Sequence, residues 1–135
     1  SDDGDTLWVS ARGSNAAFKL DPRTLEVRQR IETGNFPLRI TVRPQGDYAV
    51  TSNLSDGGLS VIDTATGKVV RNIKVSGPDQ AEAKTQVTIL FSPNGERIYV
   101  AETMANTIAE VDFASGRVLR RLPGTGGGDG LAIIE

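Results

Sequence analysis

Short runs of alternating apolar and polar residues recur along this chain, and each pair of runs is joined by a polar turn. In the segment 60–70, SVIDTATGKVV, the first run alternates like a half-buried strand, and the second is rich in β-branched residues. Asp63 can accept hydrogen bonds from the amides just beyond it, and Gly67 can take a left-handed backbone conformation at little cost. The pattern predicts a β-hairpin.

The same pattern returns upstream as FKLDPRTLEVR at 18–28 and downstream as AEVDFASGRVL at 109–119. Two sets of landmarks follow the repeat, an aspartate at positions 21, 63 and 112 and a glycine at positions 4, 46 and 95. Both sets are spaced by 42 and then by 49 residues. Because the two spacings change together, they indicate one repeated unit with an insertion. The units span approximately 4–45, 46–94 and 95–135.

Each unit is expected to contain four strands. In the middle unit they are predicted near 47–53, 58–63, 68–74 and 87–92. The inserted segment 78–86, PDQAEAKTQ, carries the only helix signal and is expected to be an ordered loop or a single helical turn. Units of this length with four short strands are typical of β-propeller blades. The sequence therefore predicts an all-β chain, a single partial β-propeller domain over 1–135, with three four-stranded antiparallel blades forming an open arc of a larger ring.

Two details of the blades follow from the same pattern. Leu25 replaces the turn glycine in the first unit, and Pro22 stiffens that turn, so this hairpin should differ in type. Leu25 should then avoid the positive φ expected of Gly67 and Gly116. Trp8 is expected to pack against an adjacent blade. Nine further positions are predicted to form the core: Val61, Val70, Ile73, Ile89, Phe91, Tyr99, Val100, Val111 and Leu119.

Three blades do not close a propeller, which typically has four to eight. The segment 131–134 resembles the predicted inner strand 86–91, but it has no complete partner sheet within its own arc. We therefore expect the remaining blades to come from a second copy, from another chain, or from parental sequence beyond this segment.

Composition removes several classes of function. The chain has 15 basic and 17 acidic residues, so it carries no basic excess to bind nucleic acid or an anionic membrane surface. No apolar run is long enough to insert into a bilayer. With no cysteine and no histidine, zinc fingers, Ser-His-Asp triads and imidazole acid–base chemistry are excluded. Catalysis would need carboxylates, Lys, Tyr or an oxygen-ligated metal.

The segments YAVTSN at 48–53 and IYVA at 98–101 echo a Tyr-Val-Thr-Asn run. Together with the order SPNGERIYVAET…NTIAEVDFASGRVLRRL, they make the chain resemble the YVTN-type β-propeller repeat family. The resemblance covers essentially the whole chain. It implies a bacterial or archaeal origin and a periplasmic or cell-surface location.

In propeller blades, the loops from an outer strand to the next inner strand share a face with the loops between the second and third strands. Such loops on a rigid scaffold often carry binding residues. Arg39, at the start of an inner strand, is expected near the central channel, where it could meet an anion. The candidate binding face comprises Arg12, Asn35, Arg39, Asn53, Asp79, Glu102, Asn106 and Asp129.

The leading interpretation is a non-catalytic β-propeller scaffold, with no cofactor, that binds a protein or small ligand through this face and the channel. The alternative is a hydrolase that resembles sugar-lactone hydrolase propellers, in which Ca²⁺ or Mg²⁺ held by carboxylate and amide oxygens activates water. Its ligands would come from Asn53, Asp79, Glu102 and Asp129. The glycine-rich segment 124–130 matches neither nucleotide fingerprint and is predicted to be a flexible lead into the last strand.

Overall fold

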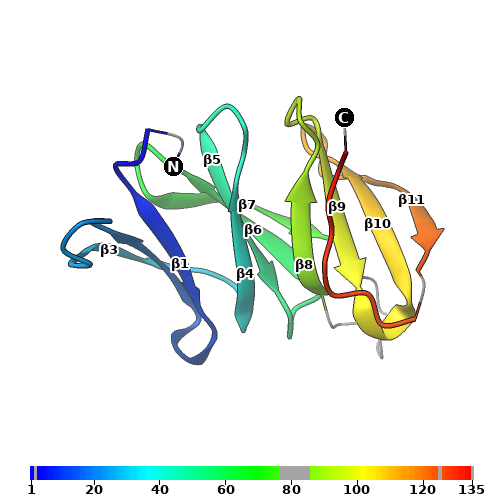
Figure 1. Cartoon of the computed structure of the whole chain (residues 1–135). Coiled ribbons are helices and arrows are strands. Elements are labelled where there is room, and N and C mark those ends of the chain that lie inside the picture. Colours follow the sequence, from blue (N-terminus) through cyan, green and yellow to red (C-terminus); the bar gives the residue numbers. More distant parts are fainter. Residues whose placement is uncertain (2, 77–85, 125, 135) are drawn as a thin grey trace.

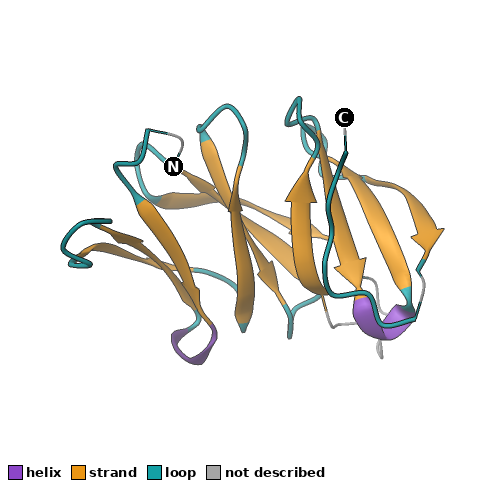
Figure 2. Cartoon of the chain, viewed as in Figure 1, coloured by secondary structure: helices purple, strands orange, loops and turns teal. Residues whose placement is uncertain are grey.

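The fold was analysed in a computed structural model that describes residues 1, 3–76, 86–124 and 126–134, without the side chains of residues 86 and 87. The inserted segment expected as a loop or helical turn lies almost wholly outside the described residues. Three antiparallel sheets stand side by side in an arc (Figure 1). Strands and turns make up nearly all of the described chain (Figure 2). The predicted all-β propeller arc is confirmed.

The three sheets are the blades, and each is named here by its strands. Blade 1 contains β1 (Leu7–Ala11), β2 (Ala16–Leu20) and β3 (Val27–Glu32). Blade 2 contains β4 (Pro37–Val42), β5 (Tyr48–Asn53), β6 (Gly58–Asp63) and β7 (Lys68–Lys74). Blade 3 contains β8 (Gln86–Phe91), β9 (Arg97–Glu102), β10 (Thr107–Asp112) and β11 (Val118–Pro123). Two single-turn 3₁₀ helices, η1 (Arg12–Ser14) and η3 (Thr103–Ala105), follow β1 and β9.

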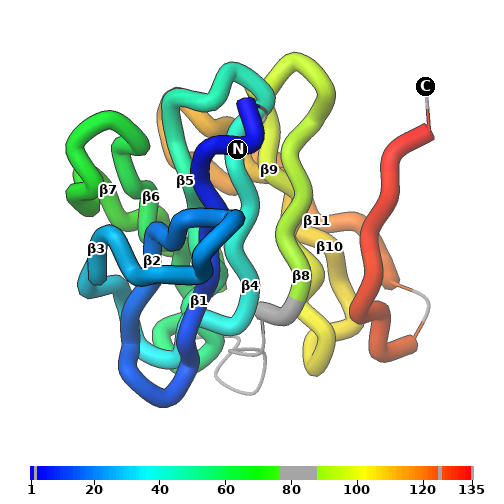
Figure 3. The backbone as a smooth tube through the Cα atoms, turned by 60° about the vertical axis from the view of Figure 1, so that its left-hand side comes forward, coloured from blue at the N-terminus to red at the C-terminus, as the bar shows by residue number. Residues whose placement is uncertain are grey.

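The innermost strands are arranged around the concave side of the arc. β4 contacts both β1 and β8, and the three strands lie next to one another in Figure 3. Unit 4–45 contains the four expected strands, β1 to β4, but β4 belongs to the next sheet, so blade 1 has three strands and no described strand pairs with the free edge of β1. Residues 131–134, expected as an inner strand, pair with no described strand. The source of any further blades stays a prediction.

The three hairpins that contain the repeated aspartates, Asp21, Asp63 and Asp112, all have the same turn. The backbone amides of Leu25, Gly67 and Gly116 each donate a 2.8 Å hydrogen bond to the carbonyl of the aspartate four residues earlier. The backbone amide of Thr66 donates a hydrogen bond to Asp63, and so does its side-chain hydroxyl. These hydrogen bonds hold the pKa of Asp63 below the ordinary value of 3.8. These aspartates therefore cap turns, as their positions in the sequence indicate.

The expectation that Leu25 avoids positive φ is wrong. Its φ is 60°, close to the 65° of Gly67 and the 72° of Gly116, so the first hairpin keeps the shared turn despite its side chain. The left-handed conformation is unfavourable for a residue with a Cβ. The interstrand ladder and the aspartate cap hold Leu25 in this conformation.

Replacing Leu25 with glycine should therefore stabilise the protein. The side chain is 61% exposed, so little apolar burial is lost. Glycine relieves the left-handed strain but loses more backbone entropy on folding. The net effect should be a gain of about 0.5–1 kcal/mol in unfolding free energy. Gly116→Ala is the converse test and should lower the unfolding free energy by about 1 kcal/mol. The new Cβ would be in a strained left-handed conformation, but it would contact only the side chain of Ile73. Urea titrations measure both, and a loss of stability in Leu25→Gly would contradict the assignment.

A β-bulge in each outer strand changes the predicted core. The pairing skips Arg28 in β3, Val70 in β7 and Leu119 in β11. Because the skipped residue turns outward, Val70 is 56% exposed and Leu119 is 46% exposed. The expectation that these two residues are in the core is wrong, and Tyr99 is only half-buried.

Apolar side chains fill both junctions between blades. Between blades 2 and 3, the cluster includes Val61, Ile73, Ile89, Phe91, Val100 and Val111, as predicted, together with Phe113. Between blades 1 and 2, a smaller cluster contains Ala17, Ile31, Ala49 and Ile62, against which Trp8 packs as expected. The two junctions fix the relative positions of the loops considered next.

Candidate functional site

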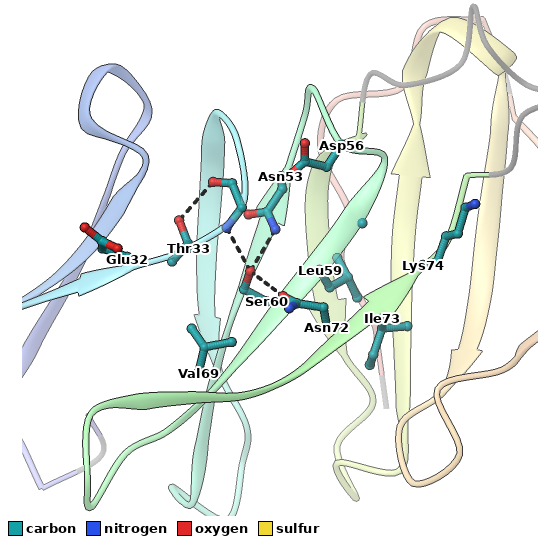
Figure 4. Close-up of a pocket in the computed structure, with 12 residues that line it drawn as sticks. Glu32, Thr33, Asn53, Asp56, Leu59, Ser60, Val69, Asn72, Ile73 and Lys74 are labelled. Carbon is teal, nitrogen blue, oxygen red and sulfur yellow. Dashed lines mark hydrogen bonds between the residues drawn. The ribbon is translucent and has the colours of Figure 1, made fainter.

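A chain of neutral polar groups lies between blades 1 and 2. The Nδ2 of Asn53 donates to Ser60 Oγ at 2.9 Å, and Ser60 Oγ donates to Asn72 Oδ1 at 3.0 Å (Figure 4). The backbone amide of Gly34, in the segment that joins the two blades, also donates to Ser60 Oγ at 3.1 Å. Asn53 and Ser60 are buried, so this network ties the connection to the middle strands of blade 2.

The connecting segment requires a glycine at this point. A Cβ on Gly34 would collide with the side chains of Asn53 and Asp56. The next residue, Asn35, donates from its backbone amide and its side-chain amide to Asp56, at 2.6 and 2.8 Å. These contacts place the loops of two neighbouring blades within hydrogen-bonding distance of each other.

A cleft of about 480 Å³ opens beside the network. Its lining is mixed, with Ser60 and Asn72 near Val69, and with Glu32 and Lys74 among the exposed residues (Figure 4). Asn72 is exposed, and its Oδ1 is occupied by Ser60. No described residue accepts a hydrogen bond from its Nδ2, so this donor is available to a ligand.

Glu102 occupies the position equivalent to Asn53, ten residues before the hairpin aspartate, but at the junction of blades 2 and 3. It is fully buried. Arg121 donates to it from Nε at 2.9 Å and from Nη2 at 3.3 Å, while Thr107 donates at 2.7 Å and Ser76 at 2.9 Å. Arg121 also donates to the carbonyl of Val75 at 2.7 Å. Glu102 is therefore the buried half of an ion pair within blade 3, and it also contacts the segment that follows blade 2 through Ser76.

The remaining described candidates are exposed. Arg12 stacks on the ring of Phe36, with its guanidinium carbon 5.7 Å from the centroid. The Nη2 of Arg39 lies 3.8 Å from Asp129 Oδ1, and Thr88 also donates to the carbonyl of Asp129. Asn106 accepts a hydrogen bond from the amide of Gly126 at 2.6 Å. Asp79 lies outside the described residues.

The structure thus divides the predicted face into two groups. Asn53 and Glu102 are buried and hydrogen-bonded within the protein, whereas Arg12, Asn35, Arg39, Asn106 and Asp129 are exposed. Within the described parts of the chain, no three acidic side chains gather closely enough to hold a metal ion. The convergence that the metal-dependent alternative requires is not seen there.

Sequence reasoning missed Ser60, Asn72 and Phe36. A signal for Asn72 was available, since it lies nine residues after Asp63, as Arg121 does after Asp112. Comparing polar residues at equivalent positions of the repeat would have paired Asn53 with Asn72 and Glu102 with Arg121.

The solved structures that resemble the chain include three β-propeller-like proteins. Hydrazine synthase from Kuenenia stuttgartiensis superposes with a TM-score of 0.82 at 26% identity, covering 95% of this chain and 35% of that chain. The dihydro-heme d1 dehydrogenase NirN in complex with DHE has a TM-score of 0.69 at 16% identity, with 88% and 24% covered. Apo AztD from Citrobacter koseri has a TM-score of 0.67 at 19% identity, with 85% and 30% covered.

These likenesses support a β-propeller module, and the chain spans only about a quarter to a third of each neighbour's length. Neither a protein-family model nor a curated protein matches the chain. The resemblance to YVTN-type repeats and the periplasmic or cell-surface location stay predictions. No helix in the described ranges has the length and apolar character to cross a membrane.

Proposed function

We propose that the chain is a non-catalytic β-propeller module that binds a small, uncharged, hydroxyl-rich ligand in the cleft between blades 1 and 2. The observation that supports this proposal is the Nδ2 donor of Asn72, which has no acceptor among the described residues and is held in place by Ser60. The cleft, at about 480 Å³, has the size of a small-molecule site. The similar solved structures include two enzymes, hydrazine synthase and the dehydrogenase NirN, and a third protein, AztD.

The chemistry of the lining favours binding over catalysis. Ser60 accepts hydrogen bonds from Asn53 and Gly34 and donates to Asn72, so its hydroxyl is engaged and none of its described hydrogen-bond partners is a base that could activate it. A hydroxyl group of a ligand can accept from Asn72 while its carbon skeleton contacts Val69. The metal-dependent hydrolase has no supporting observation among the described residues, and the proposed binding needs no cofactor.

An NMR titration with D-glucose and with maltose tests the proposal. The side-chain amide of Asn72 and the backbone amide of Gly34 are expected to shift and to saturate at millimolar sugar. Asn72→Asp keeps the oxygen that accepts from Ser60 and removes the free donor, so it should abolish the shifts.

Asn94→Asp is the matched control. Asn94 is exposed, and its Oδ1 likewise accepts a serine hydroxyl, from Ser92 at 2.7 Å, but it lies outside the cleft. This variant should bind like the wild type. If neither sugar shifts these signals, or if Asn72→Asp leaves the titration unchanged, the proposed function is wrong.

A further inference from the structure

Arg12 and Arg39 line a second cavity, of about 440 Å³, that is separate from the cleft. It lies between the end of β1 with η1 and the start of the inner strand β4. Its other lining residues are neutral: Ser10, Ala11, Gly13, Pro37 and Leu38. Both arginine residues are exposed, so two positive charges border one cavity with no carboxylate in its lining.

Most N–H donors of these two guanidinium groups have no acceptor among the described residues. Arg39 donates only a long 3.5 Å hydrogen bond to the carbonyl of Leu38, and its 3.8 Å contact with Asp129 is too long for a hydrogen bond. Within the described structure, the Arg12 guanidinium contacts the ring of Phe36. Each guanidinium carries five N–H donors in a planar fork that matches the oxygens of a carboxylate or phosphate.

Phe36 is held in a strained conformation. Its φ is 58°, while its amide donates to Asn15 Oδ1 at 2.9 Å and its carbonyl accepts from Leu54 at 3.0 Å. In blade 3 the corresponding hydrogen bond, to Asn106 Oδ1, comes from Gly126, whose φ is 89°. A phenylalanine therefore stands where glycine would be free of strain, and its ring supports Arg12. Such strain is concentrated at functional sites.

We propose that Arg12 and Arg39 form a binding site for an anionic group, a carboxylate or a phosphate, and that Phe36 is a positioning residue that orients Arg12. Asp129 is a weak internal competitor for Arg39, since its carboxylate lies at the edge of hydrogen-bonding reach. This anion-binding cavity is separate from the cleft between blades 1 and 2. Either proposed site can therefore be disproved without affecting the other.

Calorimetric titration at low salt, with inorganic pyrophosphate in one arm and citrate in the other, tests this inference. Arg12→Gln and Arg39→Gln should each weaken binding at least tenfold, and Asp129→Asn should strengthen it. The arm with the higher affinity identifies phosphate or carboxylate as the preferred group. Arg23→Gln, which removes the same charge from an exposed turn residue of blade 1, should leave the affinity unchanged.

Phe36→Leu separates positioning from stability. Leucine keeps the strained backbone and much of the apolar volume but removes the ring beneath Arg12, so affinity should fall several-fold while the melting temperature changes little. Affinities that do not change in Arg12→Gln and Arg39→Gln, or that fall equally in Arg23→Gln, would overturn the anion site. An unchanged affinity in Phe36→Leu would overturn the role given to the ring.

Discussion

Replacing Glu102 with alanine is expected to lower the unfolding free energy by about 2–3 kcal/mol, less than the cost of breaking a fully buried ion pair, because the Arg121 side chain is 30% exposed. Glu102 is fully buried, and four donor atoms point at its carboxylate. The substitution leaves the partly exposed Arg121 without its counter-charge, and it leaves the hydroxyls of Ser76 and Thr107 without this acceptor. Urea denaturation followed by circular dichroism measures the loss.

Glu32→Ala is the control for this prediction. Glu32 also pairs with an arginine, Arg30, at 3.2 Å, but its side chain is 86% exposed. Its removal should cost no more than about 0.5 kcal/mol. Replacing both partners, as Glu102→Leu with Arg121→Met, should recover much of the loss, because no unpaired charge then remains. Equal costs for Glu102→Ala and Glu32→Ala would show that the Glu102 carboxylate is not buried as described.

The second large loss is expected from Phe113→Ala, at about 3–5 kcal/mol. The ring is 5% exposed and makes an edge contact with Phe91 at 5.4 Å between centroids. The guanidinium groups of Arg43 and Arg71 lie over it, at 4.8 and 5.1 Å from its centroid. Alanine removes the apolar contacts and both cation–π contacts at once, and it opens a cavity at the junction of blades 2 and 3.

Phe113→Leu divides this loss into its parts. Leucine keeps most of the apolar volume, so the remaining cost, about 1–2 kcal/mol, reports the aromatic and cation–π contacts. Leu119→Ala, at an exposed bulge position, should change the stability by less than about 0.5 kcal/mol. If Phe113→Ala is as mild as Leu119→Ala in the same denaturation experiment, Phe113 does not hold the two blades together.

The repeat, the strands and the hairpin aspartates could be predicted because they depend on local chemistry. The alternation of the residues in 58–63 and the turn DTATG determine a hairpin whatever surrounds them. The bulges could not be predicted in this way. Alternation assigns Val70 and Leu119 to a face on the assumption of unbroken pairing, and a single skipped residue turns that side chain outward.

The candidate site was harder to predict because polar residues on this face have two roles that look alike in sequence. Glu102 and Asp129 are both acidic residues near loops, yet one is a buried partner of Arg121 and the other is exposed. The difference is determined by contacts between blades, across separations such as the 26 residues from Ser76 to Glu102. Leu25 was misjudged for a related reason, since the ladder outweighed its own backbone preference.

The two junctions between blades use different chemistry at equivalent positions. Asn53 and Asn72 join a neutral network at the first, whereas Glu102 and Arg121 form an ion pair at the second. The Glu102 side of that pair is also bound to the preceding blade, through Ser76. These blades are therefore not interchangeable modules. A gene duplication that copied blade 3 behind blade 1 would set Glu102 against Gly34, which has no side chain to donate to it. The polar contacts at the two junctions therefore favour the order in which the blades occur along the chain.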